Sequence, residues 1–226
     1  MLRKTVLYST VLLILVLSSA TFAQTEKRIA YGVLIDNTGS LRSQFGYVVE
    51  LGKGVVERIH ERGPVSLFNF TSVKNGPAVV TAGTEWSQNK AALDNYIDSL
   101  FVEPGQTTLF DAINSMAEKI NIKVNLEKDV FSDKVIVLIT DGEDRVSKIK
   151  EKQLIEKLKE SGIKVYALGL VQELVSEGVF RGPREKATDF LKKVAKETGG
   201  RAVFLESNKE DPNSVLNELF AEPGRK

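Results

Sequence analysis

Short apolar runs of strand length alternate along the chain with longer segments of helical period, and this alternation strongly constrains the fold. The runs cover residues 29–35, 65–70, 135–140, 165–170 and 202–205. Several are apolar nearly throughout, as expected for parallel strands that helices cover on both faces. The segments between them carry apolar residues at helical spacing, at residues 44–61, 89–100, 109–122, 148–161, 185–198 and 212–220. The sequence therefore predicts an α/β domain built on a largely parallel sheet.

Two further segments predict an edge strand and a surface loop. A short run at residues 78–82 follows Asn75-Gly76, a dipeptide typical of tight hairpin turns. We expect this run to form an edge strand antiparallel to the strand at 65–70. Residues 174–184 are richer in glycine and charge, which is typical of an irregular loop. The chain shows no internal repeat or low-complexity linker that would require a second domain.

The N-terminal segment, residues 1–23, predicts an export signal that is separate from the fold. Arg3 and Lys4 precede an apolar stretch at residues 6–17, and residues 18–23 end in T-F-A, close to the A-x-A cleavage pattern. The stretch is shorter than the roughly 20 residues that span a bilayer, which favours a cleaved signal peptide over an uncleaved anchor. We expect residues 24–226 to form one periplasmic or secreted domain without stable membrane insertion. An uncleaved anchor would tether the same domain outside the membrane.

Composition argues against several classes of partner and site. The formal net charge of +1 gives no reason to expect nucleic acid or an anionic membrane surface as a partner. The chain has no cysteine, which excludes disulfides and thiolate metal sites. His60 is the only histidine and lies late in a predicted helix, and neither G-x-S-x-G nor G-x-x-x-x-G-K-[ST] occurs. These features argue against a Ser-His-Asp hydrolase and against a phosphate-binding loop.

Three polar stretches are predicted to meet at one edge of the sheet. Asp36 ends the first apolar run, and Thr38 and Ser40 follow it at alternate positions. Asp141 ends the run at 135–140. Ligands of open parallel sheets sit outside the carboxyl ends of the strands, so both carboxylates reach one rim if these strands are neighbours. Thr107 precedes the helix predicted from residue 109 and is placed to face the same point from a third side.

These hydroxyl and carboxylate oxygens are ligands that hard divalent cations prefer. Mg²⁺ or Mn²⁺ suits them because both favour an octahedral shell of carboxylate, hydroxyl and water oxygens, with Ca²⁺ as an alternative. Two carboxylates alone leave the cation electron-poor, so an acidic group of a partner would complete the shell. Taken separately, each stretch has an ordinary explanation as a helix cap or a turn. Together, in this order, they predict a metal site.

The order D-N-T-G-S, T-T-L-F-D-A-I and I-T-D-G-E resembles the metal-ion-dependent adhesion site of von Willebrand factor type A domains. More narrowly, it is similar to that of bacterial exported proteins with a related domain. The resemblance covers essentially the whole chain after the signal. It implies a three-layer, doubly wound (Rossmann-like) domain, with a mostly parallel sheet of about six strands, one antiparallel edge strand and helices on both faces. The family usually has D-x-S-x-S in its first loop; here Thr38 replaces the first serine, which keeps the hydroxyl but adds a methyl group.

The resemblance also implies a ligand set and a function. It assigns as metal ligands Asp36, Thr38, Ser40, Thr107 and Asp141. Thr108 is an adjacent alternative to Thr107. In ligand-bound members of the family, a glutamate or aspartate of the partner supplies the remaining metal bond. We therefore expect a non-catalytic, exported domain that binds an acidic residue of a protein partner through the cation, in adhesion or complex assembly. Two alternatives stay open: a metal-assisted hydrolase at the same site, and a structural module without metal-dependent binding.

Overall fold

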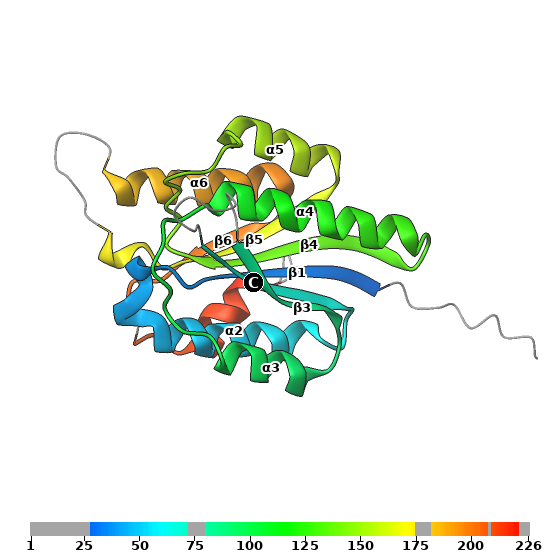
Figure 1. Ribbon diagram of the computed structural model, residues 1–226, viewed down its shortest axis with the longest axis horizontal. Helices are drawn as coiled ribbons and strands as arrows, with labels where there is room; N and C mark the ends of the chain where they lie inside the picture. The colour runs from blue at the N-terminus through cyan, green and yellow to red at the C-terminus, as the bar shows by residue number, and fades with distance from the viewer. Residues whose placement is uncertain (1–27, 72–79, 175–181, 208, 222–226) are drawn as a thin grey trace, which may run out of the picture.

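The protein is described by a computed structural model that covers residues 28–71, 80–174, 182–207 and 209–221 (Figure 1). The predicted export signal and the predicted Asn75-Gly76 turn lie outside these residues. Among the residues described, no helix is both long and apolar enough to cross a membrane.

A six-stranded sheet forms the centre of the described chain, in the spatial order β3-β2-β1-β4-β5-β6. Its strands are β1 (Arg28–Asp36), β2 (Val65–Thr71), β3 (Val80–Ser87), β4 (Phe131–Thr140), β5 (Ile163–Gly169) and β6 (Arg201–Phe204). Neighbouring strands are parallel except β3, which pairs antiparallel with β2 at the edge of the sheet. The prediction of a mostly parallel sheet with one antiparallel edge strand is confirmed.

Helices cover both faces of the sheet and make three layers (Figure 1). One face carries α2 (Phe45–Ile59), α3 (Lys90–Asp98) and α7 (Pro212–Leu219). The other carries α4 (Leu109–Leu126), α5 (Glu151–Glu160) and α6 (Pro183–Thr198). Two short 3-10 segments, η1 (Gly39–Gln44) and η2 (Val171–Glu173), follow the ends of β1 and β5. This arrangement confirms the doubly wound, Rossmann-like class.

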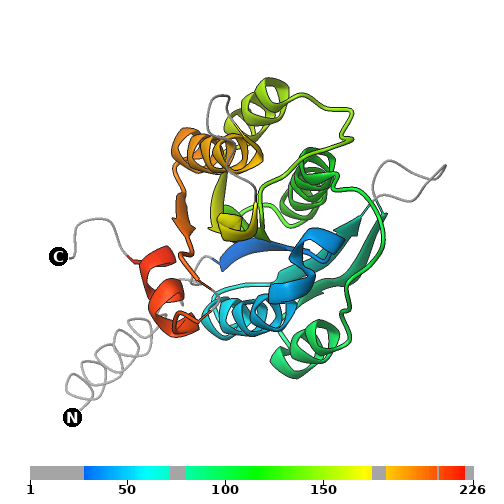
Figure 2. The same ribbon diagram turned by 90° about the vertical axis from the view of Figure 1, so that its left-hand side faces the viewer.

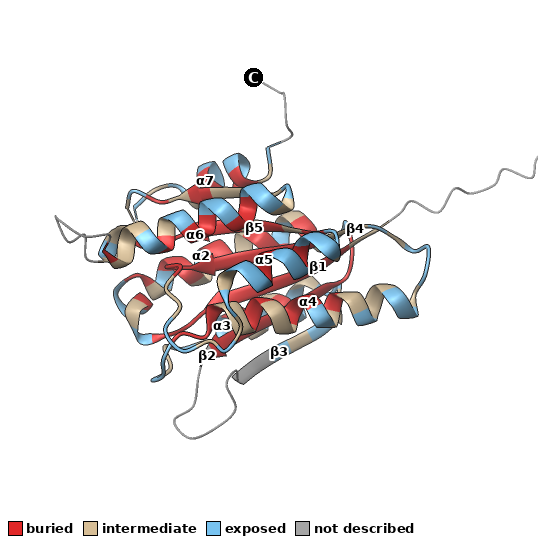
Figure 3. Cartoon of the chain, turned by 90° about the horizontal axis from the view of Figure 1, so that it is seen from above, coloured by how far each residue is buried: buried red, intermediate tan, exposed pale blue. Residues whose placement is uncertain are grey.

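The central strands are buried on both faces over residues 30–35 of β1 and 135–139 of β4, and their apolar side chains suit this position (Figure 3). Successive side chains of a strand point to opposite faces. On β1, Val33 and Ile35 therefore join the core beneath α2, whereas Ala30 and Leu34 join the core beneath α4. Both cores contain side chains of β1 and β4, so these two strands join the two helical layers.

Some element boundaries differ from the predicted ones for identifiable reasons. The edge strand, expected at 78–82, continues to Ser87, because its backbone stays paired with β2 as far as Val65. Helix α5 begins at Glu151, later than the predicted residue 148, because the amides of Lys148 and Ile149 donate to the carboxylate of Asp111. Both differences depend on a neighbouring element that the local pattern does not contain.

Candidate metal centre

The site lies where the winding of the sheet reverses direction. From β1 the chain crosses through α2 to β2 on one side, and it later returns through α4 to β4 on the other side. Ile35 of β1 is in register with Ile139 of β4, so both strands end together at one rim. Figure 2 views the molecule from this rim. Ligand sites of doubly wound folds form at such a reversal.

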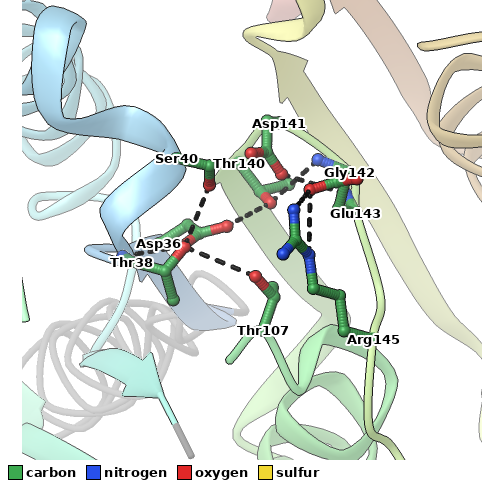
Figure 4. Close-up of polar contacts among 9 residues, drawn as sticks. All are labelled: Asp36, Thr38, Ser40, Thr107, Thr140, Asp141, Gly142, Glu143 and Arg145. Atoms are coloured by element: carbon green, nitrogen blue, oxygen red, sulfur yellow. Dashed lines mark hydrogen bonds and ion pairs between the residues drawn. The ribbon is translucent and has the colours of Figure 1, made fainter. Parts of the chain in front are cut away.

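The first loop brings Asp36, Thr38 and Ser40 together, and Thr107 joins them from the loop before α4 (Figure 4). Asp36 is fully buried, and its Oδ1 accepts hydrogen bonds from the Thr38 amide at 3.0 Å and the Thr38 hydroxyl at 2.7 Å. Thr38 Oγ1 lies 3.2 Å from Ser40 Oγ and 3.4 Å from Thr107 Oγ1. Four of the five predicted ligands therefore form one continuous polar cluster.

The segment at residues 101–103 holds the first loop on its other side. The amide of Glu103 donates to the carbonyl of Asn37 at 2.9 Å, and Asn37 Nδ2 donates to the carbonyl of Phe101 at 3.0 Å. Asn37 is fully buried. The backbone between Asp36 and Thr38 is thus fixed by contacts that do not use the hydroxyl groups.

Asp141 reaches the same rim from the end of β4. It is 1% exposed, and its Oδ1 accepts from the amide of Glu143 at 2.9 Å. Its Oδ2 is buried and has no hydrogen-bond partner among the described residues. Gly142 follows with a φ of 81°, a backbone conformation that residues with a side chain rarely adopt. This conformation turns the chain away from the site. A hollow of about 260 Å³ opens beside Asp141 and Ser40.

Burial makes two carboxylates at this rim electrostatically costly. It raises the pKa of Asp36, and the nearby Asp141 carboxylate raises it further, against the opposing hydrogen bonds from Thr38 and Thr140. Burial likewise raises the pKa of Asp141, while the hydrogen bond from the amide of Glu143 lowers it. A divalent cation would stabilise both ionised groups and satisfy the partnerless Asp141 Oδ2. The donor set therefore fits a hard cation.

The geometry distinguishes the two adjacent threonines. Thr107 Oγ1 faces Thr38, whereas Thr108 Oγ1 is buried without a hydrogen-bond partner in the described chain. In the described residues, no three Asp, Glu or His side chains gather closely enough to hold a metal. A cation at this rim would thus depend on hydroxyl oxygens as well as on the two carboxylates.

Thr140 belongs to the site and was not among the predicted residues. Its hydroxyl donates to Asp36 Oδ2 at 2.7 Å and accepts from the amide of Gly142 at 3.0 Å, so it ties the end of β1 to the end of β4. Its position directly before Asp141 is the sequence signal that could have identified it. The neighbouring ion pair between Arg145 Nη2 and Glu143 Oε2, at 2.7 Å, lines the hollow beside Asp141.

Comparison with known proteins agrees with this architecture. The model of the von Willebrand factor type A domain family matches residues 32–222. No curated protein matches the chain significantly. Similar solved structures include an aerotolerance-related membrane protein from Bacteroides fragilis, crystallised with multiple mutations to serine, at 19% identity and a TM-score of 0.56. That match covers 86% of this chain and 98% of the other.

Two further structures share the fold at lower identity. BatB from Bacteroides thetaiotaomicron is 14% identical over 85% of this chain and 96% of its own, with a TM-score of 0.57. The manganese-loaded TRAP protein from Plasmodium vivax is 13% identical over 85% of this chain and 73% of its own, with a TM-score of 0.55. At these identities the likeness shows the fold alone.

Proposed function

The chain belongs to the von Willebrand factor type A domain family, and we propose that it is a non-catalytic protein-binding domain that engages an acidic side chain of its partner through a bound divalent cation. One observation carries the proposal. Two buried carboxylates and three hydroxyls from three separate loops converge at the carboxyl edge of the sheet, where a buried oxygen of Asp141 has no partner in the described chain. This is an oxygen set that hard cations prefer.

Each residue of the site has a proposed role. The ligands would be Asp36, Thr38, Ser40, Thr107 and Asp141, some of them acting through water. When bound, the cation supplies a coordination position for the carboxylate of the partner. The hydroxyls are neutral, so they hold the cation without cancelling its charge. Mg²⁺ is our first choice, with Mn²⁺ or Ca²⁺ as alternatives, and the manganese in the similar TRAP structure supports a divalent cation in this fold.

The neighbouring Glu143 favours binding over catalysis. A metal-assisted hydrolase would need a general base beside the cation. Glu143 is a further carboxylate at this rim, but both Nε and Nη2 of Arg145 donate to it. Arg145 thus already occupies one carboxylate oxygen of Glu143, Oε2, as an acceptor, so the enzyme alternative gains no support from the geometry.

We further propose that the domain acts outside the cytoplasm, in the periplasm or secreted. The support is the basic and apolar pattern of residues 1–23. One similar structure is named as a membrane protein, which agrees with work in the envelope. A native protein whose N-terminus is still residue 1 would contradict cleavage.

Thermal unfolding tests the metal site directly. At a cation concentration of one hundred times Kd, the protein should gain about 2.7 kcal/mol, which for a domain of this size corresponds to a rise in Tm of about 5–10 °C. Asp36→Asn and Asp141→Asn keep the side-chain shape but remove one ligand charge, so both should lose this rise.

The matched control is Asp98→Asn, which removes a charge from the surface ion pair with Lys53. It should keep the full shift with Mg²⁺. An unchanged shift in both site variants would rule out the proposed ligands. A parent protein that shows no heat of binding in calorimetry with Mg²⁺, Mn²⁺ or Ca²⁺ would instead support a structural module.

A further inference from the structure

The first turn of α4 is capped by the loop that follows Asp141. The amide of Phe110 donates to Asp144 Oδ1 at 3.1 Å, and the amide of Asp111 donates to Ser147 Oγ at 3.1 Å. Thr108, which occupies the N-cap position of α4, makes no side-chain cap hydrogen bond. Free amides at a helix start need a partner, and here residues more than thirty positions along the chain provide it.

In return, a side chain of α4 accepts hydrogen bonds from backbone amides of the same loop. Asp111 uses both carboxylate oxygens, Oδ2 for the amide of Lys148 at 2.9 Å and Oδ1 for the amide of Ile149 at 3.0 Å. Ser147 Oγ also donates to Asp144 Oδ1, which connects the two halves of the network. Three side chains therefore link the start of α4 to the segment before α5 in both directions.

The loop that takes part in this network also contacts one of the proposed ligands. The carbonyl of Thr107 accepts hydrogen bonds from the amides of Arg145 at 3.0 Å and of Val146 at 3.4 Å. Thr107 lies just before the helix that Asp144 and Ser147 cap, and Asp141 lies just before the loop that Asp111 caps. The same few hydrogen bonds therefore connect the segment that begins at Thr107 to the loop that follows Asp141.

We propose that Asp111, Asp144 and Ser147 are positioning residues: they form a reciprocal clasp that holds Thr107 against Asp141 and thereby sets the cation affinity of the site. This inference rests on the proposed function. The three residues act through the backbone of the two loops that carry the proposed ligands. Loss of groups that hold metal ligands in place weakens metal affinity about 10- to 100-fold, and we expect an effect at the lower end of this range. If they served only as helix caps, their loss would lower stability and leave the affinity unchanged.

The test measures Mn²⁺ affinity by titration calorimetry on the full chain. Ser147→Ala removes the acceptor for the Asp111 amide and the donor to Asp144, so Kd should rise about 10-fold or more. Asp111→Asn keeps one carbonyl oxygen and loses one of the two amide contacts, so it should weaken binding in the same direction. Ser147→Thr retains the hydroxyl and should restore most of the affinity.

The matched control is Thr198→Val. Thr198 Oγ1 accepts from the amide of Val165 at 3.0 Å and donates to the carbonyl of Val194 at 2.7 Å, the same pattern as Ser147, but at the amino end of β5, away from the metal rim. It should lower Tm without changing Kd. Equal losses of affinity in Thr198→Val and Ser147→Ala would show a general stability effect and overturn the inference.

Hydrogen exchange provides a second readout. Saturating Mn²⁺ should slow exchange at the amides of Phe110 and Asp111 and leave that of Val165 unchanged. If Ser147→Ala and Asp111→Asn bind Mn²⁺ as tightly as the parent protein, the clasp is rejected and the proposed function stands. A parent protein that binds no Mn²⁺ would reject the proposed function, and the clasp with it.

Discussion

Both carboxylate oxygens of Asp36 are engaged by neighbouring side chains, so this residue organises the candidate site in addition to its proposed role as a ligand. Oδ1 orients the hydroxyl of Thr38, and Oδ2 receives the hydroxyl of Thr140 from the adjacent strand. The aspartate thus joins β1 to β4 at the point where both strands end. A threonine in place of the usual first serine fits this environment, because Thr38 is only 2% exposed and its methyl group is enclosed by the fold.

The two adjacent threonines should respond differently to the loss of their hydroxyls. Thr107→Val should abolish the Mg²⁺-dependent rise in Tm, because Thr107 Oγ1 faces Thr38 in the cluster. Thr108→Val should keep the rise and gain about 1 kcal/mol of stability, because it removes a buried hydroxyl that has no partner in the described chain. Thermal unfolding with and without Mg²⁺ measures both effects; the reverse pattern would assign the ligand to Thr108.

The sequence predicts those site residues whose chemistry is local. Asp36, Thr38 and Ser40 stand within one loop, and Asp141 ends a recognisable strand, so a pattern of neighbours is sufficient. Thr140 and Asp111 were missed because their partners lie on other elements, 104 positions away for Thr140 and 37–38 positions away for Asp111. Such contacts depend on how elements are placed in space, which a local pattern does not specify.

Among the elements, buried strands are easier to predict than edge strands. The strands β1 and β4 are covered on both faces, so their apolar runs at 29–35 and 135–140 locate them and mark where both end. Strand β4 begins four residues before its run, at Phe131, because its polar start still pairs with β1. The edge strand β3 carries a polar sequence, TAGTEWS after Val80, and its length comes from pairing with β2. The apolar periodicity of the helices located them, whereas their ends depend on caps supplied by other segments.

Helix α2 contains two glycines that should respond in opposite ways to alanine. A Cβ on the exposed Gly46 meets nothing within 4 Å, so Gly46→Ala should stabilise the protein by about 0.5–1 kcal/mol through the lower backbone entropy of the unfolded state. A Cβ on Gly54 would lie 2.4 Å from Leu216 Cδ1 of α7, and Leu216 is fully buried. Gly54→Ala should therefore destabilise by about 1–3 kcal/mol.

Chemical denaturation of the two variants measures this difference. Each is the control for the other, because both add one methyl group to the same helix. Equal midpoints for Gly46→Ala and Gly54→Ala would contradict the close packing of α2 on α7. A stabilised Gly46→Ala variant should also keep its Mg²⁺ response, since Gly46 makes no contact with the polar cluster.

At the scale of the whole molecule, the candidate site brings together three segments that are far apart in the sequence. Its side chains come from the end of β1 and the segment after it, from the loop before α4 and from the end of β4. The partner would meet an open edge of the domain, next to a hollow lined by Glu143 and Arg145. Specificity then depends on these loop surfaces, because attraction between a cation and a carboxylate is common to many partners.

Capture of a partner from the native envelope should therefore require both the cation and an intact rim. The full protein, immobilised in Mg²⁺, should retain a partner that a chelator releases, because the carboxylate of the partner would lose its coordination. Asp141→Asn should fail to retain that partner, while Asp98→Asn, which alters only a surface ion pair with Lys53, should retain it. Quantitative mass spectrometry of the eluates measures the difference. A partner bound equally with chelator and by Asp141→Asn would place recognition elsewhere on the domain and contradict cation-mediated binding.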